Sequence, residues 1–344
     1  MLNDILTPEE SQLMRELVSA AERIVITCHV HPDGDAVGSS LGWAEYLRSL
    51  GKDPAIIVPD QYPDFLQWLP KTERIIRYDK RREEANELLK QADLIFLLDL
   101  NQPSRTGDMA KAIEAIPEEK RIIIDHHLAT TLNCRLAVSH PEMSSTCELV
   151  FRIVWQLDAF DELTRHFASP IYCGMMTDTG GFTYNSNDPA IFHIIGLLLT
   201  KGIDKDKIYR NVYNCYSENR LRLVGYVLYE KLKVFAKQRA CLFALSRQDQ
   251  HRFHFIKGDA EGLVNMPLQI KGMRLSISLR EDTEKDNCIR ISLRSVDQFP
   301  CNKMAEKYFN GGGHLNASGG ELNCSLAEAI DIAQKAIIDI ESFL

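Results

Sequence analysis

Apolar and polar positions divide the chain into two stretches with different periods. In the first stretch, nearly unbroken apolar runs of strand length alternate with segments whose apolar residues recur at helical spacing. The strand-like runs are 23–28, 54–59, 92–99 and 121–127, and the helical patterns that alternate with them are 8–22, 41–47, 83–91 and 110–116. Because unbroken apolar runs are typical of parallel strands buried on both faces, this alternation predicts a doubly wound, mainly parallel α/β sheet.

Helical patterns continue beyond this region at 144–157 and 169–176. The segment 190–200 is apolar nearly all round, which predicts a helix buried on every side. Residues 201–230 are rich in charged residues and tyrosine at helical spacing, and they predict a linker of one or two helices with a solvated face.

After residue 230 polar and apolar positions alternate, which is the period of strands with one wet face. The alternating segments are 232–235, 241–245, 274–280 and 288–295, and a closing helix is expected at 325–343. We therefore predict a first domain at 1–196, a helical linker at 197–220, and a smaller α/β domain with a mixed sheet at 221–344.

The composition excludes several classes of protein. The 344 residues carry a net charge of −8, which argues against a surface for long duplex nucleic acid, since such surfaces need clustered Lys and Arg. The nine cysteines are scattered without a C-x-x-C pair, and this predicts a reducing, cytoplasmic location. We expect neither a secretory signal nor a membrane span, because the chain contains no apolar run of about 20 residues.

Polar side chains gather at the ends of three predicted strands. They are His29, Asp33, Asp35, Asp99, Asp125, His126 and His127. The carboxyl ends of parallel strands form the edge where open α/β sheets bind ligands, and imidazole with carboxylate suits manganese, iron or zinc. Asp33 and Asp35 could instead cap the next helix, but the convergence of three strand ends favours a metal site. Asp178 either lies in a plain helix-terminal turn or completes the ligand set.

Two further features lie in the second stretch. Gly311, Gly312, Gly313 and His314 form a glycine-rich turn that could expose backbone N–H groups to a phosphate, although such a turn alone is weak evidence. Arg274, Arg280, Arg290 and Arg294 share the polar phase of two strands, so one face of the sheet could be basic; ordinary surface arginines are the default interpretation.

Together these motifs resemble the DHH phosphoesterase superfamily with its DHH-associated C-terminal domain. The resemblance rests on His29-x-x-x-Asp33-x-Asp35, Asp99, Asp125-His126-His127, Asp178 and the glycine run. It implies two Mn²⁺ ions per chain, or other divalent metals, one held by His29, Asp33 and Asp99 and the other by Asp35, Asp99, His126 and Asp178. It further implies that Asp125 orients a histidine, that His127 acts at the phosphate, and that Arg294, Ser295, Gly311, Gly312, Gly313 and His314 bind substrate.

The activity that the resemblance implies is metal-assisted attack of water on short RNA. Its products would be mononucleotides, and the same site would dephosphorylate 3′-phosphoadenosine 5′-phosphate (pAp). Hydrolysis of cyclic or linear dinucleotides, hydrolysis of polyphosphate or pyrophosphate, exonuclease action on long strands and a non-catalytic nucleotide sensor are the alternatives. The expected partner is thus a short single-stranded RNA or a nucleotide, and the sequence leaves homodimerisation open.

Overall fold

The computed structural model describes residues 2–128, 130, 132–256 and 258–343. The chain forms two compact units, Met1–Cys215 and Tyr216–Leu344, and the point of division falls within the predicted linker at 197–220. Helices α7 (Pro189–Thr200) and α8 (Lys205–Tyr213) belong to the first unit.

The first unit is built on a six-stranded parallel sheet with the order β3-β2-β1-β4-β5-β6. Its strands are β1 (Ile24–Thr27), β2 (Ala55–Val58), β3 (Ile75–Arg77), β4 (Leu94–Leu98), β5 (Arg121–Asp125) and β6 (Leu136–Ser139). The order reverses direction at β1, where Ile26 lies opposite Ile56 on one side and Phe96 on the other. The doubly wound sheet predicted from the apolar runs is therefore present.

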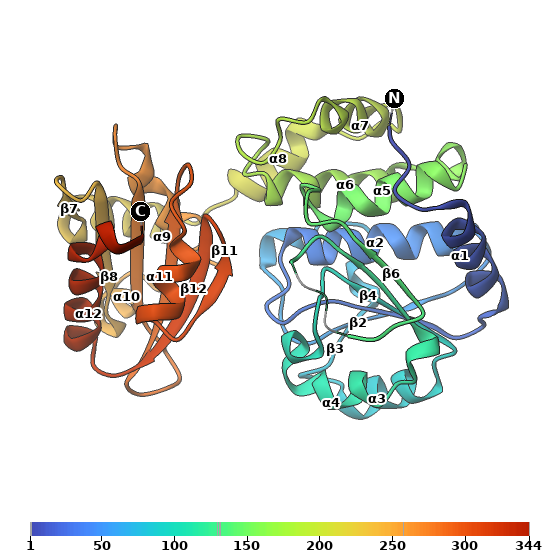
Figure 1. Ribbon diagram of the computed structural model, residues 1–344, viewed down its shortest axis with the longest axis horizontal. Coiled ribbons are helices and arrows are strands. Elements are labelled where there is room, and N and C mark those ends of the chain that lie inside the picture. Colours follow the sequence, from blue (N-terminus) through green and yellow to red (C-terminus); the bar gives the residue numbers. More distant parts are fainter. Residues whose placement is uncertain (1, 129, 131, 257, 344) are drawn as a thin grey trace. The chain divides into compact units, whose positions relative to one another are not determined.

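Helices cover both faces of this sheet (Figure 1). One face packs against α1 (Pro8–Ala20), α2 (Gly34–Ser49), α5 (Thr146–Gln156) and α6 (Arg165–Asp178). The opposite face packs against α3 (Arg82–Gln91) and α4 (Ala110–Glu114). Each strand of the sheet interior is thus apolar on both sides, which explains the unbroken hydrophobic runs.

Helix α7 departs from the sequence prediction. It buries Ile191, Ile194 and Leu198, whereas Phe192 is 54% exposed. The prediction of a helix buried on all sides is wrong, because α7 lies outside α6 and has a partner on one face only.

Helices α2 and α6 approach each other unusually closely along a row of small residues. Gly34, Gly38 and Gly42 repeat every four residues on α2 and therefore share one face of the helix. A Cβ atom placed on Gly38 would lie 2.5 Å from the carbonyl oxygen of Pro170 on α6. This contact brings the start of α2, which carries Asp35, beside the end of α6, which carries Asp178.

The second unit contains a mixed six-stranded sheet with the order β11-β12-β10-β9-β8-β7. The strands are β7 (Lys233–Phe235), β8 (Ala240–Leu245), β9 (Leu275–Glu281), β10 (Cys288–Ser295), β11 (Gly312–His314) and β12 (Ala317–Asn323). β8 and β9 run parallel and the other neighbours run antiparallel. The mixed sheet is as predicted, but the glycine-rich turn is not: Gly312, Gly313 and His314 form the strand β11, paired with β12, and Gly311 comes just before it.

Helices pack on both faces of this second sheet as well. α11 (Cys301–Tyr308) and α12 (Leu326–Ile338) share one core with the apolar residues of β9 and β10. α9 (Glu218–Tyr226) shares the other core with Phe243 and Leu245 of β8, and the short helix α10 (Arg247–Arg252) follows that strand. Among the described residues, no helix is long and apolar enough to cross a lipid bilayer.

Candidate metal centre

The structure brings the six predicted metal ligands to one edge of the first sheet. His29 follows β1, Asp99 follows β4 directly, and His126 follows β5. Asp33 and Asp35 lie at the start of α2, and Asp178 is the last residue of α6. Parallel strands end at a common edge, so residues separated by about 150 positions in the sequence become neighbours here.

The donor atoms form two groups that meet at Asp99. In the first group, His29 Nε2 lies 3.2 Å from Asp99 Oδ2 and 3.8 Å from Asp33 Oδ2. In the second group, His126 Nε2 lies 3.3 Å from Asp178 Oδ2 and 3.9 Å from Asp35 Oδ2. The other oxygen of Asp99, Oδ1, lies 3.6 Å from His126 Nε2. One donor atom from each of His29, Asp33 and Asp99 lies within 4.8 Å of the others, and the same holds for Asp35, His126 and Asp178 and for Asp99, His126 and His127. This spacing allows one ion to contact all members of a set.

Backbone contacts hold the histidine rings in a defined orientation. His29 Nδ1 lies 2.7 Å from the carbonyl oxygen of Val30, and His126 Nδ1 lies 3.3 Å from that of Met143. A carbonyl oxygen only accepts, so each Nδ1 carries the proton and Nε2 is directed at the carboxylates. This is the arrangement that fixes the tautomer of metal-binding histidines.

The carboxylates are held from the backbone in the same way. Asp35 accepts hydrogen bonds from the N–H groups of Thr146 and Cys147 at the start of α5, at 2.6 and 2.8 Å. Asp33 Oδ1 accepts from the N–H groups of Asp35 and Ala36, both at 3.0 Å. Asp33 therefore caps α2 with one oxygen and faces His29 with the other. A helix cap and a metal ligand are thus compatible roles for this residue.

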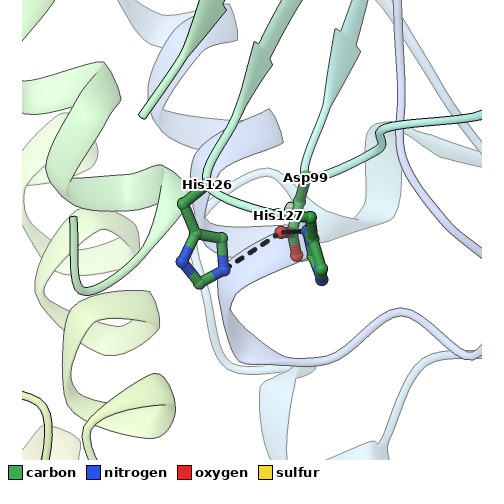
Figure 2. A group of neighbouring side chains, drawn as sticks. All are labelled: Asp99, His126 and His127. Atoms are coloured by element: carbon green, nitrogen blue, oxygen red, sulfur yellow. Dashed lines mark ion pairs between the residues drawn. The ribbon is translucent and has the colours of Figure 1, made fainter. Parts of the chain in front are cut away.

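Figure 2 shows His127 beside Asp99 and His126, and Asp125 contacts the His127 ring. His127 Nδ1 lies 2.8 Å from Asp125 Oδ1 and 3.3 Å from Asp99 Oδ1. Asp125 is fully buried, and its second oxygen has no hydrogen-bond partner among the described residues. Asp125 therefore orients the His127 ring toward the Asp99 side of the cluster.

The charges of this cluster are poorly balanced by the protein itself. Burial, together with the charges of Asp99 and Asp33, holds the pKa of Asp35 well above its usual value. Burial and the charges of Asp35, Asp33 and Asp99 do the same to the pKa of Asp178. Burial opposes protonation of His29, but the hydrogen bond to Asp99 and the charges of Asp33 and Asp99 outweigh it and raise its pKa to about 9. Divalent cations would relieve this repulsion, so the residues fit a metal centre.

Asp99 has an unusual backbone as well as a central position. Its φ is +57°, a left-handed conformation that is uncommon outside glycine. The chain changes direction at Asp99 as it leaves β4, and the carboxylate lies between the donor groups of His29 and His126. Burial raises the pKa of this carboxyl, but the hydrogen bond to His29 and the charges of His29, His127 and His126 outweigh it and lower the pKa strongly.

Sequence reasoning predicted the helix at 144–157 but missed that its first residues contact the carboxylates of the site. Thr146 donates its N–H to Asp35 and its hydroxyl to Asp99 Oδ1, the latter at 3.2 Å. The signal was the pair Ser144-Ser145 before Thr146 and Glu148, a pattern typical of a capped helix N-terminus. Nothing in it indicated which carboxylate the exposed N–H groups would contact.

The predicted substrate-binding residues lie in the second unit. Arg294 of β10 is opposite Ala317 of β12, which is in turn opposite His314 of β11, so Arg294 and His314 share one face of the sheet. Ser295 is buried, donates to the carbonyl oxygen of Phe299 at 2.7 Å and accepts from Asn316 at 2.9 Å. Gly311, Gly312 and Gly313 run against β12, where a Cβ atom on Gly311 would collide with the backbone of Gly319.

Comparison with known proteins agrees with this fold. Residues 23–175 match the DHH family, N-terminal domain, and residues 243–341 match the DHHA1 domain. The chain belongs to the DHH family, and it is a hydrolase that acts on phosphoester bonds.

Three individual proteins are similar to this chain over most of its length. The chain is 29% identical over 316 residues to the bifunctional oligoribonuclease and PAP phosphatase NrnA of Thermus thermophilus, covering 91% of this chain and 89% of that protein. It is 24% identical to the cyclic-di-AMP phosphodiesterase GdpP of Bacillus subtilis, of which it spans 49%. A solved structure of an exopolyphosphatase-related protein from Bacteroides fragilis is 48% identical over 99% of both chains, with a TM-score of 0.95.

Proposed function

We propose that this protein hydrolyses short oligoribonucleotides to mononucleotides and removes a phosphate from pAp, with a pair of divalent cations at the candidate metal centre. The observation that carries the proposal is the pair of donor groups sharing Asp99. The substrate class comes from the similarity to NrnA enzymes over most of the chain.

We divide the residues between two ions as the family resemblance implies. His29, Asp33 and Asp99 would hold one ion, and Asp35, Asp99, His126 and Asp178 would hold the other. Mixed imidazole and carboxylate donors suit Mn²⁺, which is our choice among the divalent metals. When bound, such a pair of ions lowers the pKa of a water molecule and offsets negative charge on phosphorus.

The protein's own groups supply orientation and proton handling. Because Asp125 holds the proton on His127 Nδ1, the other ring nitrogen is the one that would exchange a proton with substrate. Arg294 and His314, on the same face of the second sheet with β12 between their strands, would bind a substrate phosphate through charge-assisted hydrogen bonds. Ser295 would position these two residues through its contacts with Phe299 and Asn316. The homodimer and the cytoplasmic location stay predictions.

The experiment is a substrate panel with Mn²⁺. It comprises 5′-labelled RNAs from dimers to 24-mers, pAp, cyclic di-AMP, its linear form and polyphosphate. We expect rapid turnover of dimers to pentamers and of pAp, slow turnover of 24-mers, and no turnover by an Asp99→Asn variant prepared in parallel. Equal rates on the longest and shortest RNAs would contradict the short-substrate proposal.

Two arms of the panel test alternatives that the relatives bring. Preferred turnover of cyclic di-AMP would place the chain with GdpP, although the chain spans only about half of that protein. Preferred turnover of polyphosphate would instead follow the description of the Bacteroides fragilis relative.

A further inference from the structure

Arg105 lies beside the candidate metal centre and has not been assigned a role so far. It belongs to the turn of 3₁₀ helix Pro103–Met109, which follows Asp99 and β4. Its carbonyl oxygen accepts the N–H of Val30 at 2.7 Å, and Val30 is the residue after His29. The backbone of Arg105 is therefore fixed one residue away from a predicted metal ligand.

The same turn is held from a second point. Gly107 has φ +57°, and a Cβ atom there would lie 2.8 Å from the side chain of Val30. Only glycine adopts this backbone readily and leaves room for that approach. Asp99, Arg105 and Gly107 thus form a single tight loop against the chain that carries His29, which makes the position of Arg105 a built feature of the fold.

The guanidinium of Arg105 has no partner among the residues that the structure describes. Within the described ranges, no hydrogen bond or ion pair joins it to another side chain. The nearby carboxylates of Asp33 and Asp99 contact His29 instead. The buried arginines Arg121 and Arg152 of this unit are satisfied: Arg121 donates to two carbonyl oxygens and Arg152 pairs with Glu148. The positive charge of Arg105 nevertheless acts on the His29 ring, where it opposes the rise of that pKa.

An unpaired arginine next to a cluster of carboxylates needs an explanation. The carboxylates are directed toward histidines and backbone N–H groups, so the planar fork of N–H donors on Arg105 is left for another anion. A phosphate is the anion that the guanidinium fork fits best, through two parallel hydrogen bonds.

We infer that Arg105 binds a non-bridging oxygen of the substrate phosphate beside the metal centre, and this inference rests on the proposed function. The first unit would then contribute its own phosphate-binding arginine, in addition to the residues predicted in the second sheet. Because every substrate of the proposed class presents such an oxygen, the contact would serve RNA and pAp alike.

The test compares Arg105→Gln and Arg105→Lys with the natural protein. Arg135→Gln is the matched control: Arg135 is exposed at the start of β6, at the opposite end of the strands from the metal centre. With Mn²⁺, we expect Arg105→Gln to lower kcat/KM on pAp and on an RNA dimer about 10- to 100-fold, the range for losing a hydrogen bond to a charged group. Arg105→Lys keeps the charge without the fork and should fall between, while Arg135→Gln should stay within twofold.

Two further measurements separate binding of phosphate from a structural role. Calorimetric titration with adenosine 5′-monophosphate in Mn²⁺ should show about tenfold weaker binding to Arg105→Gln. The rise in Tm on adding Mn²⁺ should be kept or increased, because removing a positive charge does not weaken a cation site. A kcat/KM within twofold of the natural protein, or a loss of activity matched by a loss of the Mn²⁺ effect on Tm, would overturn the inference. Failure of the proposed function would look different: the natural protein itself would turn over none of the phosphoesters.

Discussion

The contact between α2 and α6 allows a sharp test of how the fold builds the metal centre. Replacing Gly38 with Ala places a methyl group 2.5 Å from the carbonyl oxygen of Pro170 and 3.0 Å from Cys147 Sγ. Ordinary contacts of a Cβ atom begin at 3.4 Å, so the two helices must separate by about 0.9 Å at this point. A backbone oxygen cannot rotate away as the end of a side chain can.

The expected cost follows from that displacement. Overpacking of this kind destabilises a protein by about 1–3 kcal/mol, and in a unit of this size each kcal/mol lowers Tm by about 2–4 °C. Asp35 lies three residues before Gly38 on α2, and Asp178 ends α6, so the substitution separates two carboxylates of one donor group. A misplacement of about 1 Å costs about 100-fold in rate, and we expect that loss in kcat/KM on pAp.

Gly196→Ala is the matched control for this substitution. Gly196 also lies within a helix, α7, but a Cβ atom there meets nothing within 4 Å. The control should keep full activity and gain up to about 1 kcal/mol in the free energy of unfolding from the better helix propensity of Ala. Thermal unfolding and pAp turnover are measured for both variants with and without Mn²⁺. If Gly38→Ala retained the natural kcat/KM and the natural response to Mn²⁺, close helix packing would not be what positions the carboxylates.

Four further predictions concern charge and metal. Asp99→Asn should abolish turnover, because Asp99 faces both donor groups, while the metal-free variant keeps the circular dichroism spectrum of the natural protein. Residual activity above 1% of the natural rate (roughly 3 kcal/mol of barrier) would contradict the shared position of Asp99. Mn²⁺ at 100 times its dissociation constant should stabilise the first unit by about 2.7 kcal/mol, which is about 5–10 °C in Tm and is reversed by a chelator. In the metal-free protein, Asp178→Asn should raise the free energy of unfolding at pH 7. Burial and neighbouring carboxylates raise the pKa of Asp178 in the folded state, so above its unfolded value of 3.8 this carboxyl destabilises the fold. The gain from the substitution should disappear on acidification below that value. In the second unit, burial alone would raise the pKa of Asp249, but hydrogen bonds from Lys231, the backbone and hydroxyl of Ser246, and Tyr226 lower it to about 2. Asp249→Asn should therefore lower the free energy of unfolding in urea at pH 7 by about 2 kcal/mol. This cost should fade as the pH drops from about 4 to 2.

The sequence determined which residues would reach the sheet edge. Unbroken apolar runs end at Asp99 and at Asp125-His126-His127. Because parallel strands end at the same edge of a sheet, the residues that follow them lie at that edge. The short edge strands β3 and β6 escaped notice because three or four residues with partial exposure carry little periodic signal. The family resemblance added the division of the ligands between two ions.

Tertiary structure decided the distances and the partners. Nothing in the pattern around Asp178 indicated that the end of α6 would stop 3.3 Å from His126, since that depends on how closely glycine lets α6 approach α2. The N–H groups of Thr146 and Cys147 on Asp35, and the lone guanidinium of Arg105 beside His29, likewise join residues far apart in the chain. A one-dimensional pattern records which side chains are available at a strand end or helix start, whereas their mutual contacts arise only when separately formed elements pack together.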